Sequence, residues 1–365
     1  MDIRTDLEGM TLALQWAAKG LYTTSPNPHI GCVIVKDGRV IGAGVTQPAG
    51  HDHAEIQALK DAAARGHDVR GATAYVTLEP CNHFGRTPPC SDALVRAGLG
   101  RVVAAMEDPN PLVAGQGMAK LAAAGIAVSS GLLADAAYEL NIGFFSRMRR
   151  GLPWVRMKSA ASLDGMTALH NGQSQWITGA EARADGHAWR ARACAILTGI
   201  GTVKADDPQL NVRAVDTPRQ PRRIVVDSRL DTDPAARVLA GGGTWIAAAV
   251  PDAAKEAALR AAGAEIIMLP NAAGKVDLAE LMRELGRRQI NELHVEAGAK
   301  LNGSLIREGC VDELLLYVAP TLLGEAQGMF ALPALTSLAQ QRRLKFHEVR
   351  QIGDDLRILA RFNPL

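Results

Sequence analysis

Residues 79–90 read EPCNHFGRTPPC, a segment placed between an expected strand, ATAYVTL at 72–78, and an expected helix, SDALVRAG at 91–98. Cys81 therefore follows the end of a strand, and Cys90 stands at the opening of a helix. The macrodipole and the free amides at a helix N-terminus favour a thiolate. We expect both sulfurs to ionise readily, as metal ligands must.

A second stretch, HDHAEI at 51–56, supplies the other parts of a metal centre. A zinc ion that activates water needs three protein ligands, one open coordination position and a nearby carboxylate that shuttles protons. His53, Cys81 and Cys90 are the candidate ligands. Glu55, which opens an expected helix two residues after the histidine, is the candidate proton shuttle.

Two other interpretations of these residues are open. A structural zinc site needs a fourth protein ligand, and His51 or His83 is available for that role. Isolated histidines and cysteines are also commonly solvated or packed in a core. Neither alternative has a use for Glu55, so its place in the pattern favours a catalytic centre.

Composition narrows the partners and the compartment. The 365 residues are 47% hydrophobic and 21% charged, which predicts a globular protein with two domains. With 40 basic and 38 acidic residues and only 4% aromatic residues, we expect small-molecule partners, no nucleic acid and no membrane surface. Five cysteines do not suggest a disulfide framework, and the chain shows neither a signal-peptide pattern nor an apolar run of membrane-spanning length. These features predict a cytoplasmic protein, which we expect to be a homo-oligomer, either a dimer or a tetramer.

Strands and helices alternate along both halves of the chain, as in α/β layered domains. The first half opens with a helix and a hairpin, IGCVIV and VIGAGVT. The second half has strands at AILTG, RRIVVD, TWIAAAV, EIIML, ELHVEAG and ELLLYVAP. A basic cluster followed by glycine and proline predicts a boundary between domains 1–147 and 148–365. No GxGxxG motif follows the first strand of the second domain, so a Rossmann fold is not supported.

The pattern His53-Ala54-Glu55 with a later Pro80-Cys81 and Cys90 resembles the zinc-dependent nucleobase deaminases, although eight residues separate the cysteines where that signature has two. The longer form, together with PNPHIGCVIVKDG, MKSAASLDGMTA and SQWIT, resembles the bifunctional deaminase–reductases of riboflavin biosynthesis along nearly the whole chain. The resemblance implies a cytidine-deaminase-like α/β/α domain followed by a dihydrofolate-reductase-like α/β domain. It also implies one Zn²⁺ per chain and NADPH.

The activities that this resemblance implies are two successive steps. The first is hydrolytic deamination of 2,5-diamino-6-ribosylamino-4(3H)-pyrimidinone 5′-phosphate. The second is NADPH-dependent reduction of 5-amino-6-ribosylaminouracil 5′-phosphate to its ribityl form. Two alternatives are a deaminase of transfer-RNA type with an accessory domain, which would need basic stripes and aromatic platforms, and a zinc-stabilised binding protein without activity.

The resemblance also implies the residues that bind substrate and cofactor. In the deaminase domain the substrate residues are Asn27, His51, Asn82 and His83. In the reductase domain the cofactor residues are Ala160, Trp176, Thr178, Thr202, Asp206, Ser228, Gly298, Ala299, Lys300, Leu301, Asn302, Gly303 and Ser304. The substrate residues there are Lys158, Ser174, Arg190, Leu210, Arg213 and Glu296.

Two of these groups also have a physical rationale. In AGAKLNGSLIREG the glycines permit close backbone approach, and a helix that we expect to begin near Asn302 would offer free amides to a pyrophosphate. A simple strand-to-helix turn is the alternative. Arg190 and Arg213 are suited to a substrate phosphate because a guanidinium binds phosphate oxygens in pairs, although a surface arginine is more often only solvated.

Overall fold

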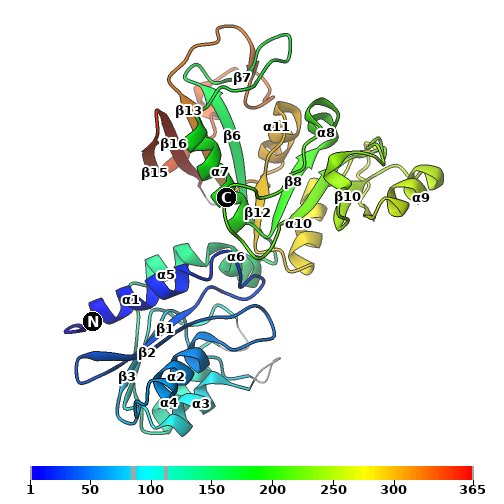
Figure 1. Cartoon of the computed structure of the whole chain (residues 1–365). Coiled ribbons are helices and arrows are strands. Elements are labelled where there is room, and N and C mark those ends of the chain that lie inside the picture. The colour runs from blue at the N-terminus through cyan, green and yellow to red at the C-terminus, as the bar shows by residue number, and fades with distance from the viewer. Residues whose placement is uncertain (1, 84–87, 111–113, 364–365) are drawn as a thin grey trace. The chain divides into compact units, whose positions relative to one another are not determined.

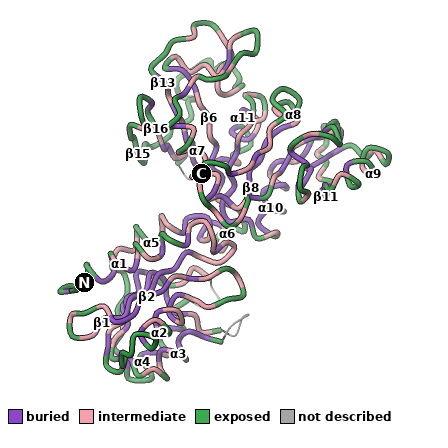
Figure 2. Tube along the Cα trace, viewed as in Figure 1, coloured by how far each residue is buried: buried purple, intermediate pink, exposed green. Residues whose placement is uncertain are grey.

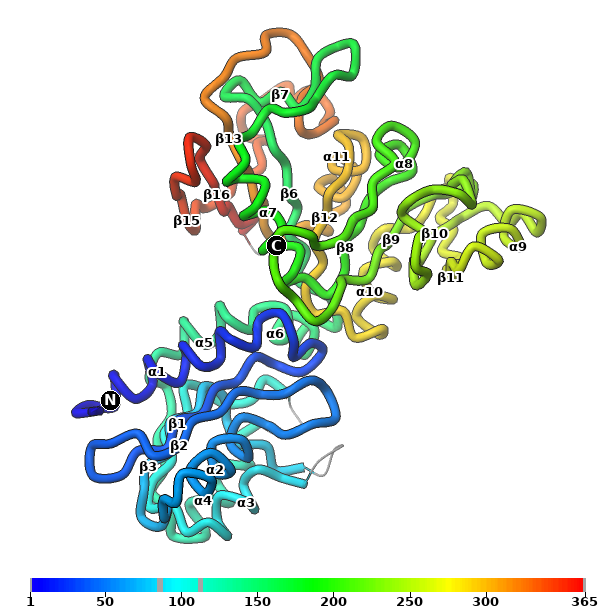
Figure 3. Tube along the Cα trace, viewed as in Figure 1, coloured from blue at the N-terminus to red at the C-terminus, as the bar shows by residue number. Residues whose placement is uncertain are grey.

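The computed structural model describes residues 2–83, 88–110 and 114–363. The chain divides into two compact units, Met1–Arg150 and Gly151–Leu365 (Figures 1 and 3). The boundary expected after residue 147 lies in the last turn of α6 (Ile142–Arg150), because the basic cluster there is helical. In both units the central strands are largely buried and the outer faces of the helices are exposed (Figure 2). No helix in these described ranges is long and apolar enough to cross a membrane.

The first unit is built on a five-stranded sheet with the order β2-β1-β3-β4-β5. β1 pairs antiparallel with β2 and β3, and β3, β4 and β5 are parallel. The strands are β1 (Gly31–Lys36), β2 (Arg39–Val45), β3 (Thr73–Val76), β4 (Arg101–Ala104) and β5 (Ala127–Ser130). The helices are α1 (Asp6–Ala18), α2 (Ala54–Ala64), α3 (Cys90–Ala97), α4 (Gln116–Ala123), α5 (Ala134–Leu140) and α6. The hairpin expected from IGCVIV and VIGAGVT is confirmed.

Side chains alternate between the two faces of this sheet, and each face has its own core. Cys32 and Ile34 of β1 pack in a cluster with α2, α3 and α4, whereas Val33 and Val35 pack in a cluster with α1 and α5. This three-layer arrangement follows from the two-residue period of a strand. Cys32 has a packing role, because its side chain is fully buried.

The second unit is built on a nine-stranded sheet with the order β11-β10-β9-β8-β12-β6-β13-β16-β15. From β11 to β13 the pairings are parallel, and β16 and β15 are antiparallel additions. The strands are β6 (Trp154–Ser162), β8 (Ala195–Gly199), β9 (Arg222–Val226), β10 (Thr244–Ala248), β11 (Ala264–Met268), β12 (Glu292–Val295), β13 (Glu313–Ala319), β15 (Leu344–Ile352) and β16 (Asp355–Phe362). A separate two-stranded sheet joins β7 (Met166–Ala168) and β14 (Gln327–Gly328).

Helices cover both faces of the nine-stranded sheet, as a parallel sheet requires. The helices are α7 (Ala180–Arg192), α8 (Ile200–Asp206), α9 (Ala253–Ala261), α10 (Leu278–Arg287) and α11 (Ala299–Arg307). α10 and α11 contribute to one core cluster, and α8 and α9 contribute to the cluster on the opposite face. The six strands expected from the sequence between 195 and 320 are present. α8 and the C-terminal hairpin β15–β16 were not predicted.

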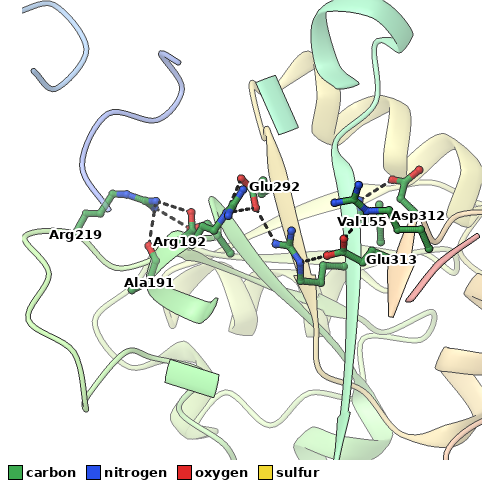
Figure 4. Close-up of polar contacts among 10 residues, drawn as sticks. Val155, Ala191, Arg192, Arg219, Glu292, Asp312 and Glu313 are labelled. Atoms are coloured by element: carbon green, nitrogen blue, oxygen red, sulfur yellow. Dashed lines mark hydrogen bonds and ion pairs between the residues drawn. The ribbon is translucent and has the colours of Figure 1, made fainter. Parts of the chain in front are cut away.

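A buried ionic cluster joins the starts of β12 and β13 to the adjacent strand β6 (Figure 4). Arg156 donates from Nε to Glu313 at 2.5 Å and from Nη1 to Glu292 at 2.8 Å, and Arg192 of α7 donates to Glu292 at 2.8 Å. Arg219 caps the C-terminal end of α7 by donating a hydrogen bond to the carbonyl of Ala191 at 3.2 Å. The cluster lies at the strand starts, at the opposite end of the parallel strands from the predicted cofactor residues.

Candidate active sites

The three predicted zinc ligands meet at one edge of the first sheet. His53 is the N-cap of α2, Cys81 follows β3, and Cys90 is the first residue of α3. The Nδ1 atom of His53 lies 3.6 Å from Cys81 Sγ and 3.4 Å from Cys90 Sγ. All three ligand atoms lie within 4.8 Å of one another. Tetrahedral zinc with bonds of about 2.0–2.3 Å needs ligand atoms roughly 3.5 Å apart, so this donor set fits zinc.

The two sulfurs differ in their electrostatics. A hydrogen bond from the Cys90 side chain, supported by His53 and the Cys90 amide, lowers the pKa of Cys81 to about 4. Conversely, the hydrogen bond with Cys81 and burial raise the pKa of Cys90. Without a metal, the coupled pair of sulfurs therefore readily holds one thiolate and resists a second. Metal binding would displace the proton of the Cys90 thiol, because a cysteine that coordinates a metal is a thiolate.

Glu55 lies in the first turn of α2 with a side chain suited to proton transfer. The residue is 2% exposed, and its Oε2 atom has no hydrogen-bond partner among the described residues. Burial, followed by the charge of Cys81, raises the pKa of Glu55 to about 7 against the opposing effect of His53. A carboxyl group that changes protonation near neutrality is able both to take and to return a proton.

No fourth protein ligand completes the metal cluster within the ranges that the structure describes. His51 and His83, the alternative ligands, are both exposed. Of the other predicted substrate residues, Asn82 accepts a hydrogen bond from Ser91 Oγ at 3.0 Å, and Asn27 lies in the loop before β1. Residues 84–87, between the cysteines, lie outside the described residues. A structural zinc site is therefore not supported.

Glu79 supports the segment before Cys81 through contacts that we did not predict from the sequence. Its buried carboxylate accepts hydrogen bonds from four backbone amides, those of Asp108 at 3.0 Å, Gly115 at 2.9 Å, Gly117 at 2.8 Å and Met118 at 3.2 Å. These amides belong to the segment after β4 and to the start of α4. The contact therefore ties two remote segments to the residues just before Cys81. Its only local signal is an acidic residue before the Pro-Cys pair.

The predicted cofactor residues of the second unit gather at the carboxyl ends of three neighbouring parallel strands. Ser228 follows β9, Thr202 lies in α8 after β8, and Gly298 follows β12 as the N-cap of α11. A Cβ atom on Gly298 would lie 3.8 Å from Thr202 Oγ1. Ligands of open α/β sheets bind beyond the carboxyl ends of the strands, so this edge is the expected place for a cofactor.

α11 begins at Ala299, and the prediction of a start near Asn302 was wrong. The backbone amide of Asn302 already donates to Gly298 O at 3.1 Å, so the amides without a helical partner are those of residues 299–301. The remaining predicted residues of this segment have structural contacts. Asn302 Nδ2 donates to Ala297 O at 3.0 Å, a Cβ on Gly303 would lie 2.2 Å from Ala331 O, and Ser304 Oγ donates to Lys300 O at 3.2 Å.

The other predicted cofactor residues are more dispersed. Ala160 lies on β6, and Thr178 is buried just before α7. Trp176 is 69% exposed, and its ring lies 4.5 Å from the Arg183 guanidinium. Asp206 is exposed at the last residue of α8. The structure therefore brings Ser228, Thr202 and the start of α11 together more clearly than it does these four.

Glu296 and Arg190 form the centre of the predicted substrate site. Arg190 donates to both carboxylate oxygens of Glu296, at 2.5 and 2.7 Å. Burial alone would raise the pKa of Glu296, but the charge and hydrogen bonds of Arg190 hold it well below its usual range. Lys158 contributes to the same electrostatic environment, and burial lowers the pKa of its ammonium group. The guanidinium fork of Arg190 is thus occupied by a carboxylate in this structure, and its expected role as a phosphate ligand stays a prediction.

The other predicted substrate residues differ in accessibility. Arg213 is exposed, and its backbone amide donates to His187 Nδ1 at 3.3 Å. Ser174 is partly buried in the loop before α7. The side chain of Leu210 packs in a hydrophobic core cluster, so only its backbone is available to a ligand. The sequence also gave no sign of His294, whose buried ring places Nε2 3.2 Å from Glu296 Oε1 without hydrogen-bond geometry.

The fold and the two sites define a zinc-dependent deaminase domain joined to a reductase domain. Residues 3–106 match the cytidine and deoxycytidylate deaminase zinc-binding region, and residues 153–358 match the RibD C-terminal domain. The riboflavin biosynthesis protein RibD of Escherichia coli K12 is 48% identical over 361 residues, covering 95% of this chain and 96% of the relative. RibD of Bacillus amyloliquefaciens is 42% identical over 356 residues, covering 96% and 95%. The chain belongs to the RibD family.

Solved structures of relatives agree over the whole length. Acinetobacter baumannii RibD in one crystal form has a TM-score of 0.90 at 43% identity, covering 98% of this chain and 99% of that one. A diaminohydroxyphosphoribosylaminopyrimidine deaminase/5-amino-6-(5-phosphoribosylamino)uracil reductase from Thermotoga maritima has a TM-score of 0.85 at 30% identity with the same coverage. The protein is thus a bifunctional deaminase and reductase of riboflavin biosynthesis. The zinc and NADPH predicted from the sequence are confirmed as its cofactors. The transfer-RNA deaminase alternative finds no support.

Proposed function

We propose that His53, Cys81 and Cys90 hold the zinc ion and that Glu55 moves the protons of the deamination. The observation that supports this proposal is the convergence of three donor atoms within 4.8 Å beside a buried carboxyl group whose Oε2 has no partner in the described part of the chain. When bound, zinc lowers the pKa of a coordinated water from about 15.7 toward about 7. Glu55 takes a proton from the attacking water and delivers it to the ring nitrogen, and it then takes the second proton from the added hydroxyl group and delivers it to the departing amine.

We propose 2,5-diamino-6-ribosylamino-4(3H)-pyrimidinone 5′-phosphate as the substrate of this first step. The T. maritima relative is named for the same chemistry, and the long spacing between Cys81 and Cys90 supports the same choice. Asn27, His51, Asn82 and His83 are the proposed contacts to the pyrimidine and its ribose phosphate. Water replaces the amino group, ammonia leaves, and a carbonyl group remains on the ring.

In the second unit we propose that the free amides of residues 299–301 hold the NADPH pyrophosphate, with Thr202 and Ser228 beside it. When bound, NADPH supplies the hydride that reduces the ribosyl group to ribityl. Lys158 and Glu296 orient the ribose, and Arg190 fixes the Glu296 carboxylate in position. With Arg190 engaged in this way, Arg213 is the proposed phosphate ligand, because its exposed guanidinium is accessible to a phosphate.

The two sites are tested by measuring ammonia release and NADPH oxidation separately. Glu55→Gln should stop ammonia release and leave NADPH oxidation intact when the deaminated substrate is provided. Glu296→Gln should do the reverse, so each variant is the control for the other. Zinc removal with a chelator should match Glu55→Gln. Loss of both activities in a folded Glu55→Gln protein, or ammonia release that survives zinc removal, would overturn the two-site proposal.

We also propose that the chain is a cytoplasmic homo-oligomer, either a dimer or a tetramer. All five cysteines are free, which suits a reducing compartment. β15 is an edge strand, and Phe346 and Val349 on it are 70% and 55% exposed. An exposed edge strand that carries two large apolar side chains is able to pair with a second copy through its free backbone groups. Light scattering coupled to size-exclusion chromatography tests this, and a monomer at micromolar concentration would contradict it.

A further inference from the structure

A buried asparagine in the deaminase unit makes two-way hydrogen bonds with a remote backbone segment. Asn141, which is 2% exposed, lies between α5 and α6. Its Oδ1 accepts from the backbone N–H of His29 at 2.7 Å, and its Nδ2 donates to the carbonyl of His29 at 3.0 Å. Nδ2 also donates to Ala137 O at 3.2 Å. The side-chain amide therefore pairs with the backbone of His29 as a neighbouring strand would.

The segment that Asn141 holds is the loop that carries Asn27. The fully buried Thr24 contacts the His29 ring, with Oγ1 2.5 Å from Nδ1, and it donates to Asn27 O at 3.3 Å. The backbone amide of Asn27 donates back to Thr24 O at 2.9 Å. A continuous chain of contacts thus runs from Asn141 through His29 and Thr24 to Asn27.

The same loop lies at the edge of the sheet where the metal ligands converge. The carbonyl of Ile30 accepts from the Thr46 amide at 2.9 Å, on the segment that leads to His53. The Gly31 amide donates to Thr77 Oγ1 at 3.1 Å, on the segment that leads to Cys81. The position of the loop 24–30 is therefore set on one side by the zinc-binding segments and on the other by Asn141.

We propose that Asn141 is a positioning residue of the deaminase, which fixes Asn27 against the substrate through His29 and Thr24. This inference rests on the proposed substrate contact of Asn27 and adds a residue outside the metal and substrate motifs. The role requires an amide, because the site presents one N–H group and two carbonyl oxygens to the side chain. A carboxylate of the same shape keeps the bond to the His29 amide but places an oxygen against the carbonyls of His29 and Ala137.

The test is a double-mutant cycle on ammonia release by the zinc-loaded full-length enzyme. Asn141→Asp should raise the KM for the diaminopyrimidinone phosphate by about tenfold, with a smaller change in kcat, for the loss of about one buried hydrogen bond. Asn27→Ala should raise the same KM, and the double variant should be no worse than Asn27→Ala alone. Zinc content and NADPH oxidation should be unchanged in all three proteins. A residue that serves only stability would not be coupled to Asn27.

Two further variants keep the inference falsifiable. Asn271→Asp is the matched control, because Asn271 uses only its Oδ1, as an acceptor from the amides of Ala273 and Lys275, and a carboxylate keeps both bonds. If Asn141→Asp does not fold, Thr24→Val removes the intermediate hydroxyl while preserving shape, and it should show the same coupling. Effects that multiply in the double variant, or an unchanged KM in Asn141→Asp, would overturn the inference. An unchanged KM in Asn27→Ala would instead remove the proposed substrate contact.

Discussion

A single methyl group on β2 should disable the deaminase through the position of α2. Gly44 faces the start of that helix, and a Cβ atom there would lie 2.4 Å from Ala54 O and 2.5 Å from Ala58 N. Ordinary contact between such atoms needs about 3.5 Å, so in Gly44→Ala the first turn of α2 must move by about 1 Å. That turn carries Glu55, and His53 is its N-cap.

The magnitude follows from this displacement. Overpacking of this kind costs about 1–3 kcal/mol of unfolding free energy. A misplacement of about 1 Å at a catalytic group costs about 100-fold in rate. We therefore expect Gly44→Ala to release ammonia about 100-fold more slowly and to hold zinc more weakly. Oxidation of NADPH with the deaminated substrate should be unchanged, since β2 and α2 belong to the other unit.

Ammonia release, zinc content and urea unfolding measure the three effects. Gly186→Ala is the control, because no atom lies within 4 Å of a Cβ at this helical position, and the change should be neutral or stabilising. Gly42→Ala, whose Cβ would lie 2.3 Å from Ala58 O, perturbs the same helix further from Glu55. A Gly44→Ala protein with full zinc content and the normal rate of ammonia release would refute the reasoning.

Three other substitutions test the supporting contacts. Glu79→Gln replaces an acceptor oxygen with an amide that cannot accept, so the deaminase unit should lose about 1–3 kcal/mol in urea unfolding while NADPH oxidation persists. Arg156→Met leaves Glu292 and Glu313 buried without their shared cation, and the reductase unit should lose about 3–5 kcal/mol in the same assay. Burial, with nearby arginines, lowers the pKa of His187 to about 4, so as pH falls from 6.5 the unfolded chain binds a proton that the folded chain does not. The free energy of unfolding should therefore fall between pH 6.5 and about pH 4, and His187→Gln should make this fall smaller. Equal slopes of the unfolding free energy against pH in the two proteins would contradict this assignment.

The elements that local pattern predicts are those whose burial is reflected in their own residues. β1 and β2 are apolar on both faces because a layer of helices packs against each face of their sheet. The turn between the two strands indicates the hairpin. The hairpin β15–β16 has no such pattern, since β15 is exposed along nearly its whole length and mixes Lys, Glu and Arg with apolar residues. α8 is a short helix in IGTVKAD, where packing of Val203 in the core overrides weak local preference.

The metal centre was predictable because each of its residues stands beside the end of an element. Once the strands are paired, the starts of α2 and α3 must lie near the end of β3, and the chemistry of His53, Cys81 and Cys90 then indicates the ion. The supporting contacts are different in kind. The amides that bind Glu79 lie up to 39 positions away, and the partner of Arg190 lies 106 positions away. No local spacing encodes such contacts.

The family resemblance marks segments for binding, and the structure shows what the individual side chains in those segments contact. Gly303 and Leu210 both match the family pattern. Gly303 has no side chain and so leaves room for the backbone of Ala331, and the Leu210 side chain lies in a core cluster. Glu55 Oε2 is different, because it forms no hydrogen bond with the described residues. A buried polar group without a partner is costly in a folded protein unless a ligand or water supplies one. On this criterion we propose that Glu55 Oε2 is left for water or substrate, and that Arg190, which donates to both carboxylate oxygens of Glu296, holds that carboxylate in place.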